Sequence, residues 1–159
     1  EKLNLLENDL KEQTQVIMDI YSRYLFETAV FEQSQSKFLM AEDLNNLMLW
    51  AQKEAYGDGL DAEYLNPGMW ICKSHYYSAN LSFYNFPYAF GDLFALGLYS
   101  LFEKEGASFV EKYNALLNAT VTCTAEEAGK MVGIDLTDKA FWKAGLEQIA
   151  KKVEAFVEL

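Results

Sequence analysis

Residues 87–106 read PYAFGDLFALGLYSLFEKEG, and this stretch decides the fold. Up to Phe102 it is apolar on nearly every face of a helix, and such a helix is buried in a domain centre or in a membrane. Asp92 and a length of about sixteen residues favour the domain centre. Pro87 suits the first turn and Gly106 suits the end. We therefore predict a central, buried helix that begins near Pro87.

Helical spacing of apolar residues continues on the N-terminal side of this stretch. No Pro or Gly interrupts residues 1–56, and four polar residues with weak helix preference predict a break at 33–36. A new helix is expected to begin near Ala41 and to stop at Gly57. Residues 57–69 carry three glycines and a proline, which predicts a loop.

Three more helices are predicted on the C-terminal side, at about 107–118, 124–132 and 139–157. Thr124 and Glu127 have the spacing of a capping box, and Thr137 is expected to form a weaker capping box ahead of the last helix. No stretch shows sustained alternation with β-branched residues. The prediction is an all-α fold, a multi-helix bundle that forms one domain over residues 1–159.

Composition restricts the class of protein. The net charge of −11 argues against nucleic acid and acidic membrane surfaces as partners, because a polyanion would be repelled. No uncharged apolar run reaches membrane length, which argues against a membrane protein. Cys72 and Cys123 do not form a disulfide framework and suit free thiols in a reducing compartment. We therefore expect a cytoplasmic protein.

Residues 74–91, SHYYSANLSFYNFPYAFG, crowd hydroxyls and an imidazole together. They hold the chain's single histidine, His75, and four tyrosines: Tyr76, Tyr77, Tyr84 and Tyr88. Each of these residues alone is more often a structural side chain than a functional one. Together they are neutral hydrogen-bond donors on rigid rings, which suit a developing oxyanion or a peptide backbone. The segment is a candidate donor cluster.

Metal-ligating residues are too few for a catalytic zinc site. Such a site needs about three protein ligands and a water position. The sequence has one histidine, two distant cysteines, and no HExxH, HxH or CxxC motif. We therefore expect no metal ligands in this chain. A Ser-His-Asp triad through His75 is not favoured, since no GxSxG turn is present.

Several stretches resemble one known family, oligoendopeptidase F, of the thimet-oligopeptidase group of zinc metallopeptidases. The stretches that carry the resemblance are SHYY (74–77), FYNFPYAFGDLFALGLY (83–99), RYLFETAVFEQ (23–33), LNNLMLWAQKEAYGDGLD (44–61) and GIDLTDKAFWKAGLEQI (133–149). They cover nearly the whole chain and occur in the family's order. The His-aromatic stretch with its following helix is the most specific of them.

The resemblance implies a role within a larger enzyme. Members carry the HExxH motif and a third ligand, a glutamate, upstream of this segment, and neither is present in this chain. The chain also starts at Glu1 within a helical pattern, so we expect a C-terminal portion of a thimet-oligopeptidase/neurolysin-like catalytic domain. The intact enzyme would use zinc to hydrolyse short peptides. This portion would bind no catalytic zinc, be inactive alone and pack on the missing N-terminal part.

The resemblance also assigns site residues. His75 matches the family histidine that assists catalysis, and Tyr84 and Tyr88 are the candidate tyrosines for stabilising the oxyanion. Many members read FYxYxY, whereas Phe86 stands here in place of the middle tyrosine, so the choice between Tyr84 and Tyr88 stays open. Tyr76 and Tyr77 are weaker candidates, for substrate binding.

A second class of function remains open beside the peptidase. The same aromatic segment suits a non-catalytic helical module that binds peptides or partner proteins. An in-frame HExxH motif upstream of Glu1, with a glutamate beyond it, would favour the enzyme.

Overall fold

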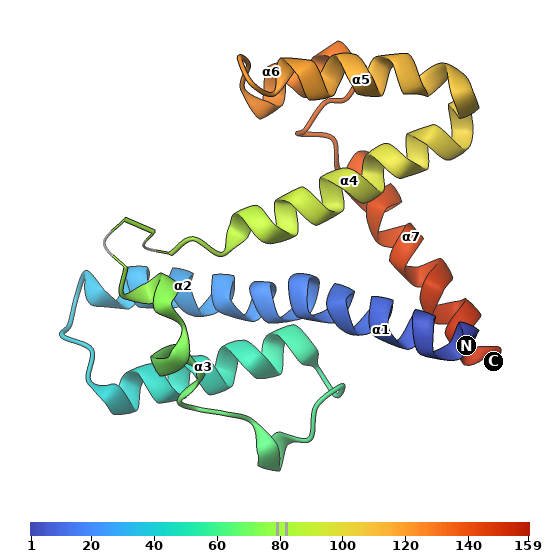
Figure 1. Ribbon diagram of the computed structural model, residues 1–159. Coiled ribbons are helices and arrows are strands. Elements are labelled where there is room, and N and C mark those ends of the chain that lie inside the picture. The colour runs from blue at the N-terminus through green and yellow to red at the C-terminus, as the bar shows by residue number, and fades with distance from the viewer. Residues whose placement is uncertain (79, 82) are drawn as a thin grey trace. The chain divides into compact units, whose positions relative to one another are not determined.

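The computed structural model describes residues 1–78, 80, 81 and 83–159, and every regular element in these residues is helical (Figure 1). The prediction of an all-α helical bundle is confirmed for the described residues. The α-helices are α1 (Lys2–Thr14), α2 (Ile20–Ser34), α3 (Ala41–Tyr56), α4 (Phe86–Glu105), α5 (Phe109–Ala119), α6 (Ala125–Met131) and α7 (Lys139–Val157). None of the described helices combines the length and the apolarity that a membrane crossing requires.

Shorter helical turns join these helices. A π-helical turn, η1 (Gln15–Asp19), stands between α1 and α2, where the sequence predicted ordinary helix. The remaining turns are 3-10 helices: η2 (Ala62–Tyr64), η3 (Met69–Cys72), η4 (Ser74–Tyr76) and η5 (Gly106–Ser108).

The chain divides into two compact units. One unit comprises Lys11–Phe90, and the other comprises Glu1–Leu10 together with Gly91–Leu159. The division falls inside α4, between Phe90 and Gly91.

In the unit Lys11–Phe90, α2 and α3 run antiparallel, side by side (Figure 1). Phe26, Met48 and Ala51 are the buried centre of their contact. The break between them is confirmed, because α2 ends at Ser34 and α3 begins at Ala41. The Asp43 carboxylate accepts a hydrogen bond from the Met40 N–H and so caps α3.

The loop after α3 is tied back to it. Gly57 ends α3 with a φ of 56°, a left-handed value that favours glycine. The buried Gln52 side chain then donates to the Asn66 carbonyl at 2.8 Å and accepts from the Asn66 N–H at 3.1 Å. Asn45 accepts a 2.9 Å hydrogen bond from the Trp70 indole. These contacts fix the position of the chain that leads into residues 74–91, the segment that holds His75.

The second unit is centred on α4, α5 and α6. Its buried core consists of Leu98, Phe109, Leu116, Ala128, Val132 and Ile134. Thr124 and Glu127 form the predicted capping box at the start of α6. The predicted bounds of α7, 139–157, are confirmed, but the predicted cap at Thr137 is wrong by one residue. The N-cap is Asp138, whose carboxylate accepts from the Ala140 N–H, while the Thr137 hydroxyl bonds Asp135.

The prediction that α4 is buried all round is not met in this chain. Its buried residues are Gly97, Leu98 and Ser100, whereas several of its aromatic residues are exposed. Part of the apolar surface of α4 is therefore left uncovered by the other described residues. Gly97 allows a close approach of α7 to α4. A Cβ there would lie 2.5 Å from the Phe141 ring of α7.

Gly145 of α7 makes a second close approach to α4, and we expect Gly145→Ala to lower the unfolding free energy by about 1–3 kcal/mol. A Cβ at Gly145 would lie 2.9 Å from the backbone oxygen of Leu93, which cannot rotate away. Gly91→Ala is the matched control, because a Cβ there meets no atom within 4 Å. That change should be neutral, or stabilising by about 0.5–1 kcal/mol. Urea unfolding of both variants tests this. Equal midpoints would contradict the close approach.

Candidate functional site

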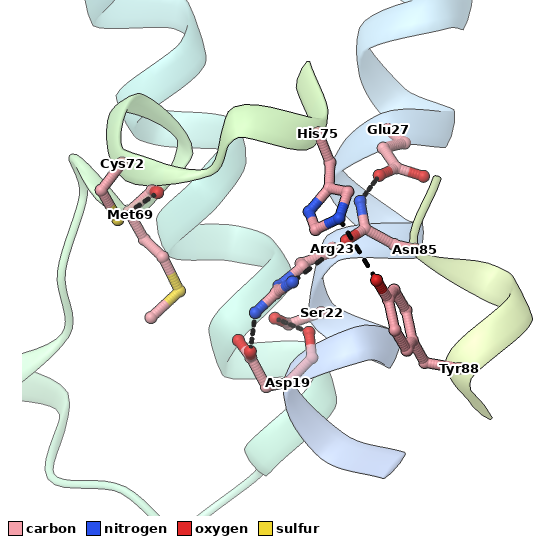
Figure 2. Close-up of polar contacts among 9 residues, drawn as sticks. All are labelled: Asp19, Ser22, Arg23, Glu27, Met69, Cys72, His75, Asn85 and Tyr88. Atoms are coloured by element: carbon pink, nitrogen blue, oxygen red, sulfur yellow. Dashed lines mark hydrogen bonds and ion pairs between the residues drawn. The ribbon is translucent and has the colours of Figure 1, made fainter. Parts of the chain in front are cut away.

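His75 and Tyr88 point toward one another from the two ends of the aromatic segment (Figure 2). His75 lies in η4, and Tyr88 lies in the first turn of α4. The Tyr88 hydroxyl is 3.5 Å from Nε2 of His75. Their ring centroids are 5.9 Å apart, with an interplanar angle of 73°. The fold thus pairs a predicted site histidine with one of the two predicted site tyrosines.

This pair lines a cavity of about 370 Å³ within the unit Lys11–Phe90. The opposite wall is a helical face that presents Glu12, Gln15, Val16, Ile20 and Arg23. Gln15 and Val16 belong to the π turn, and π turns inside helices frequently mark functional sites. A volume of this size falls within the range of small-ligand pockets.

The other predicted tyrosines are placed differently. Tyr84 packs edge-on against Tyr88, with centroids 6.0 Å apart. Of the two, Tyr88 is the one that lines the cavity. The Tyr77 hydroxyl donates to the Trp70 carbonyl at 3.3 Å. Burial raises the pKa of Tyr76, as does the nearby Glu27 carboxylate, and its buried hydroxyl finds no hydrogen-bond partner among the described residues.

A buried polar network includes Arg23, which also lines the cavity (Figure 2). It consists of Asp19, Arg23 and Glu27, which follow one another at four-residue spacing, and of Asn85, which directly precedes α4. Arg23 pairs with the Asp19 carboxylate through Nη2 and donates through Nη1 to Oδ1 of Asn85 at 3.0 Å. Nδ2 of Asn85 donates to Oε1 of Glu27. All four residues are buried.

The network shifts the acidity of Glu27. Burial raises the pKa of its carboxyl from 4.5 to about 7, against the opposing effects of the Asn85 hydrogen bond and the Arg23 charge. The charges of the network also affect the pKa of Tyr56 in α3. Burial raises the pKa of its hydroxyl, the Asp19 charge raises it further, and the Arg23 charge lowers it.

Arg23 lines the cavity but does not offer it a free cation. Both of its Nη atoms are used within the network, and Nε is buried without a partner among the described residues. The cavity instead presents a neutral hydroxyl, an imidazole, the Gln15 amide and the Glu12 carboxylate. This set suits the amide groups of a peptide backbone better than an anionic ligand.

The described residues do not fit a metal centre. No group of three or more His, Cys, Asp or Glu side chains among them could hold a metal ion.

Comparison with known proteins adds no relative: no family model, curated protein or solved structure matched the chain.

The network residues were not predicted as part of the site. The available signal was the spacing of Asp19, Arg23 and Glu27, which places three charges along one face of a helix. Asn85 was visible only as a residue ahead of the helix that begins near Pro87. Nothing in the local pattern links it to α2, because 62 residues separate it from Arg23.

Proposed function

We propose that this chain forms the donor wall of a peptide-binding cleft, as the C-terminal helical part of a zinc oligopeptidase of the oligoendopeptidase F type. The observation that carries the proposal is the convergence of His75 and Tyr88 on one cavity. The resemblance of the SHYY and FYNFPYAFG stretches supports the same assignment. Short peptides are the proposed substrates.

The chemistry available to this wall is hydrogen-bond donation. A ring N–H of His75 and the O–H of Tyr88 can donate to a peptide carbonyl, and each would donate more strongly to an oxyanion that forms from it. A preorganised donor of this kind is worth about 100- to 1000-fold in rate. The metal ligands and the group that activates water would come from the upstream part of a longer protein, so the chain alone should hydrolyse no peptide.

A non-catalytic peptide-binding module is the second candidate. The mixed lining of the cavity favours it as well, because neutral donors beside Glu12 and Gln15 bind peptide backbones without any chemistry. Restoring the upstream coding sequence distinguishes the two functions. A longer protein that cleaves peptides in a chelator-sensitive way supports the peptidase, and one that only binds them supports the module.

Peptide binding by the chain itself tests the donor wall. Tyr88→Phe removes one hydroxyl and keeps the ring, so we expect it to weaken the binding of short peptides about 2- to 10-fold, the usual worth of one hydrogen bond. Titration of isotope-labelled chain with peptides, followed by NMR, measures the dissociation constant.

Tyr24→Phe is the matched control for this titration. Tyr24 lies in the same unit and is 51% exposed, against 47% for Tyr88, but it does not line the cavity. Equal dissociation constants for the two variants would show that the Tyr88 hydroxyl does not contact peptide.

A further inference from the structure

Asn85 connects α2 to the start of α4 through every polar atom of its side chain. Its amide is fully buried, at 0% exposure. Oδ1 accepts from Arg23, and Nδ2 donates to Glu27. Arg23 is in turn paired with Asp19, the last residue of the π turn. A side-chain amide held at both ends cannot rotate without losing a hydrogen bond in a buried place, which costs about 1–3 kcal/mol.

Asn85 is also bonded directly to the turn that carries Tyr88, one member of the proposed His75–Tyr88 donor pair. The Tyr88 N–H donates to the Asn85 carbonyl at 3.2 Å, so the clamped residue fixes the helical turn that carries the Tyr88 side chain. Asn85 and Tyr88 are also only three residues apart along the chain, so the backbone links them directly. A shift of Asn85 on α2 therefore moves the Tyr88 hydroxyl with it.

His75 is held against the same helix from the other end of the segment. The ring of Tyr76, its neighbour, packs edge-on against Phe26 of α2, with centroids 5.4 Å apart. The His75 carbonyl accepts a 2.9 Å hydrogen bond from the Phe83 N–H. Phe83 has a φ of 56°, unusual for a residue with a side chain, and its ring lies 4.4 Å from that of Phe31. A strained backbone conformation of this kind persists only where surrounding contacts enforce it, and such positions often lie at functional sites.

Stability alone gives little reason for such a network. A buried ion pair is often no more stabilising than well-packed apolar residues of similar volume, because both charges must leave water. What buried polar groups do supply in some proteins is one defined arrangement. Here the arrangement that Asn85 defines is the placement of the first turn of α4, within the unit Lys11–Phe90, against α2.

We infer that Asn85, clamped between Arg23 and Glu27, is the positioning residue of the His75–Tyr88 pair. It acts through Tyr88 and contacts no substrate. Arg23 and Glu27 orient its amide, and Asp19 orients Arg23. The inference rests on the proposed function, because that function is the reason to position the pair. The contact between the His75 and Tyr88 rings can nevertheless be measured without any peptide.

The first test asks whether His75 and Tyr88 remain together when the clamp is removed. In the unmodified chain, NMR should show ring-to-ring contacts between His75 and Tyr88, and Tyr88→Phe should change the ring nitrogen shifts of His75. In Asn85→Ala, both signals should be lost. Ala51→Gly is the control for a general loss of stability, because Ala51 is fully buried in the same unit but outside the network. It should keep both signals.

Arg23→Lys gives a second variant should Asn85→Ala not fold. Lysine keeps the charge beside Asp19 but lacks the planar fork that reaches Asp19 and Asn85 together. The ring contacts should weaken in the same way. If the ring contacts and the effect of Tyr88→Phe on His75 persist in every variant that folds, the inference is overturned. Absence of both signals in the unmodified chain would also overturn it.

Peptide binding separates this inference from the proposed function. If Asn85 acts through Tyr88, Asn85→Ala should weaken binding by about the same 2- to 10-fold as Tyr88→Phe, and the double variant should lose no more than either single variant. Independent, multiplying losses would contradict the inference and leave the donor wall intact. A Tyr88→Phe variant that binds normally, while the ring contacts still depend on Asn85, would contradict the function and leave the positioning role intact.

Discussion

In a longer peptidase that contains this chain, Tyr88→Phe is expected to lower kcat about 100-fold, the usual worth of one oxyanion donor. His75→Ala should cause a loss of similar size. The proposed charge develops only in the transition state, so kcat should fall while KM changes little. Steady-state kinetics with a fluorogenic short peptide measure both constants. Tyr84→Phe should cost less, because Tyr84 packs on the ring of Tyr88 and does not line the cavity.

The size of the effect must be separated from loss of folding. Both groups lie at the surface of the cavity, His75 half-buried and Tyr88 47% exposed, so their loss should change the melting temperature little. Tyr24→Phe again serves as the control for removing an exposed hydroxyl. Near-normal kcat in His75→Ala, Tyr84→Phe and Tyr88→Phe would mean that the segment is packed aromatic surface and supplies no catalytic donor.

Helix positions were predictable because the sequence marks them locally. Gly57 and Gly106 end helices with left-handed φ values that most residues avoid, and Pro87 occupies the first turn of α4. The Thr124–Glu127 capping box is readable from spacing alone. Each of these signals acts within one or two turns of chain, so no tertiary contact is needed to recognise it.

Three features of the helices did not follow from the pattern of residue types. Periodicity predicted plain helix across Gln15–Asp19, because one π turn hardly changes the pattern of apolar residues around it. The apolarity of α4 predicted burial, but burial depends on what surrounds a helix. Thr137 and Asp138 both suit an N-cap, and the choice of Asp138 follows from the turn at Asp135, which uses the Thr137 hydroxyl.

The candidate site was predictable by residue type but not by arrangement. The sequence offered His75 and four tyrosines as donors and left the choice between Tyr84 and Tyr88 open. The approach of His75 to Tyr88 depends instead on contacts between this segment and α2. Two contacts with α2 position the segment: Asn85 is hydrogen-bonded to Arg23, and the Phe83 ring packs against the Phe31 ring. The burial that raises the pKa of Glu27 was likewise invisible, because a glutamate in an amphipathic helix is exposed far more often than buried.

The acidity of Glu27 has a measurable consequence for stability. Its pKa is about 7 in the folded chain and 4.5 ordinarily, so the folded state holds this proton more tightly than the unfolded state does. The corresponding stability is fully present below pH 4.5 and is lost as the pH rises through about 7. A shift of that size is worth about 3 kcal/mol. The Asn85 hydrogen bond and the Arg23 charge both lower the pKa of Glu27, but burial outweighs them.

Glu27→Gln is therefore expected to gain about 3 kcal/mol of unfolding free energy relative to the unmodified chain between about pH 4.5 and pH 8. Glutamine can still accept the hydrogen bond from Asn85, but it cannot ionise. Urea unfolding of both proteins across this range gives the difference. Acids with lowered pKa, such as Glu103 and Asp43, change stability in the opposite direction but are common to both proteins, so their effects cancel. A constant difference from pH 4.5 to 8 would mean that Glu27 titrates alike in both states, and that its carboxylate is solvated in the folded chain.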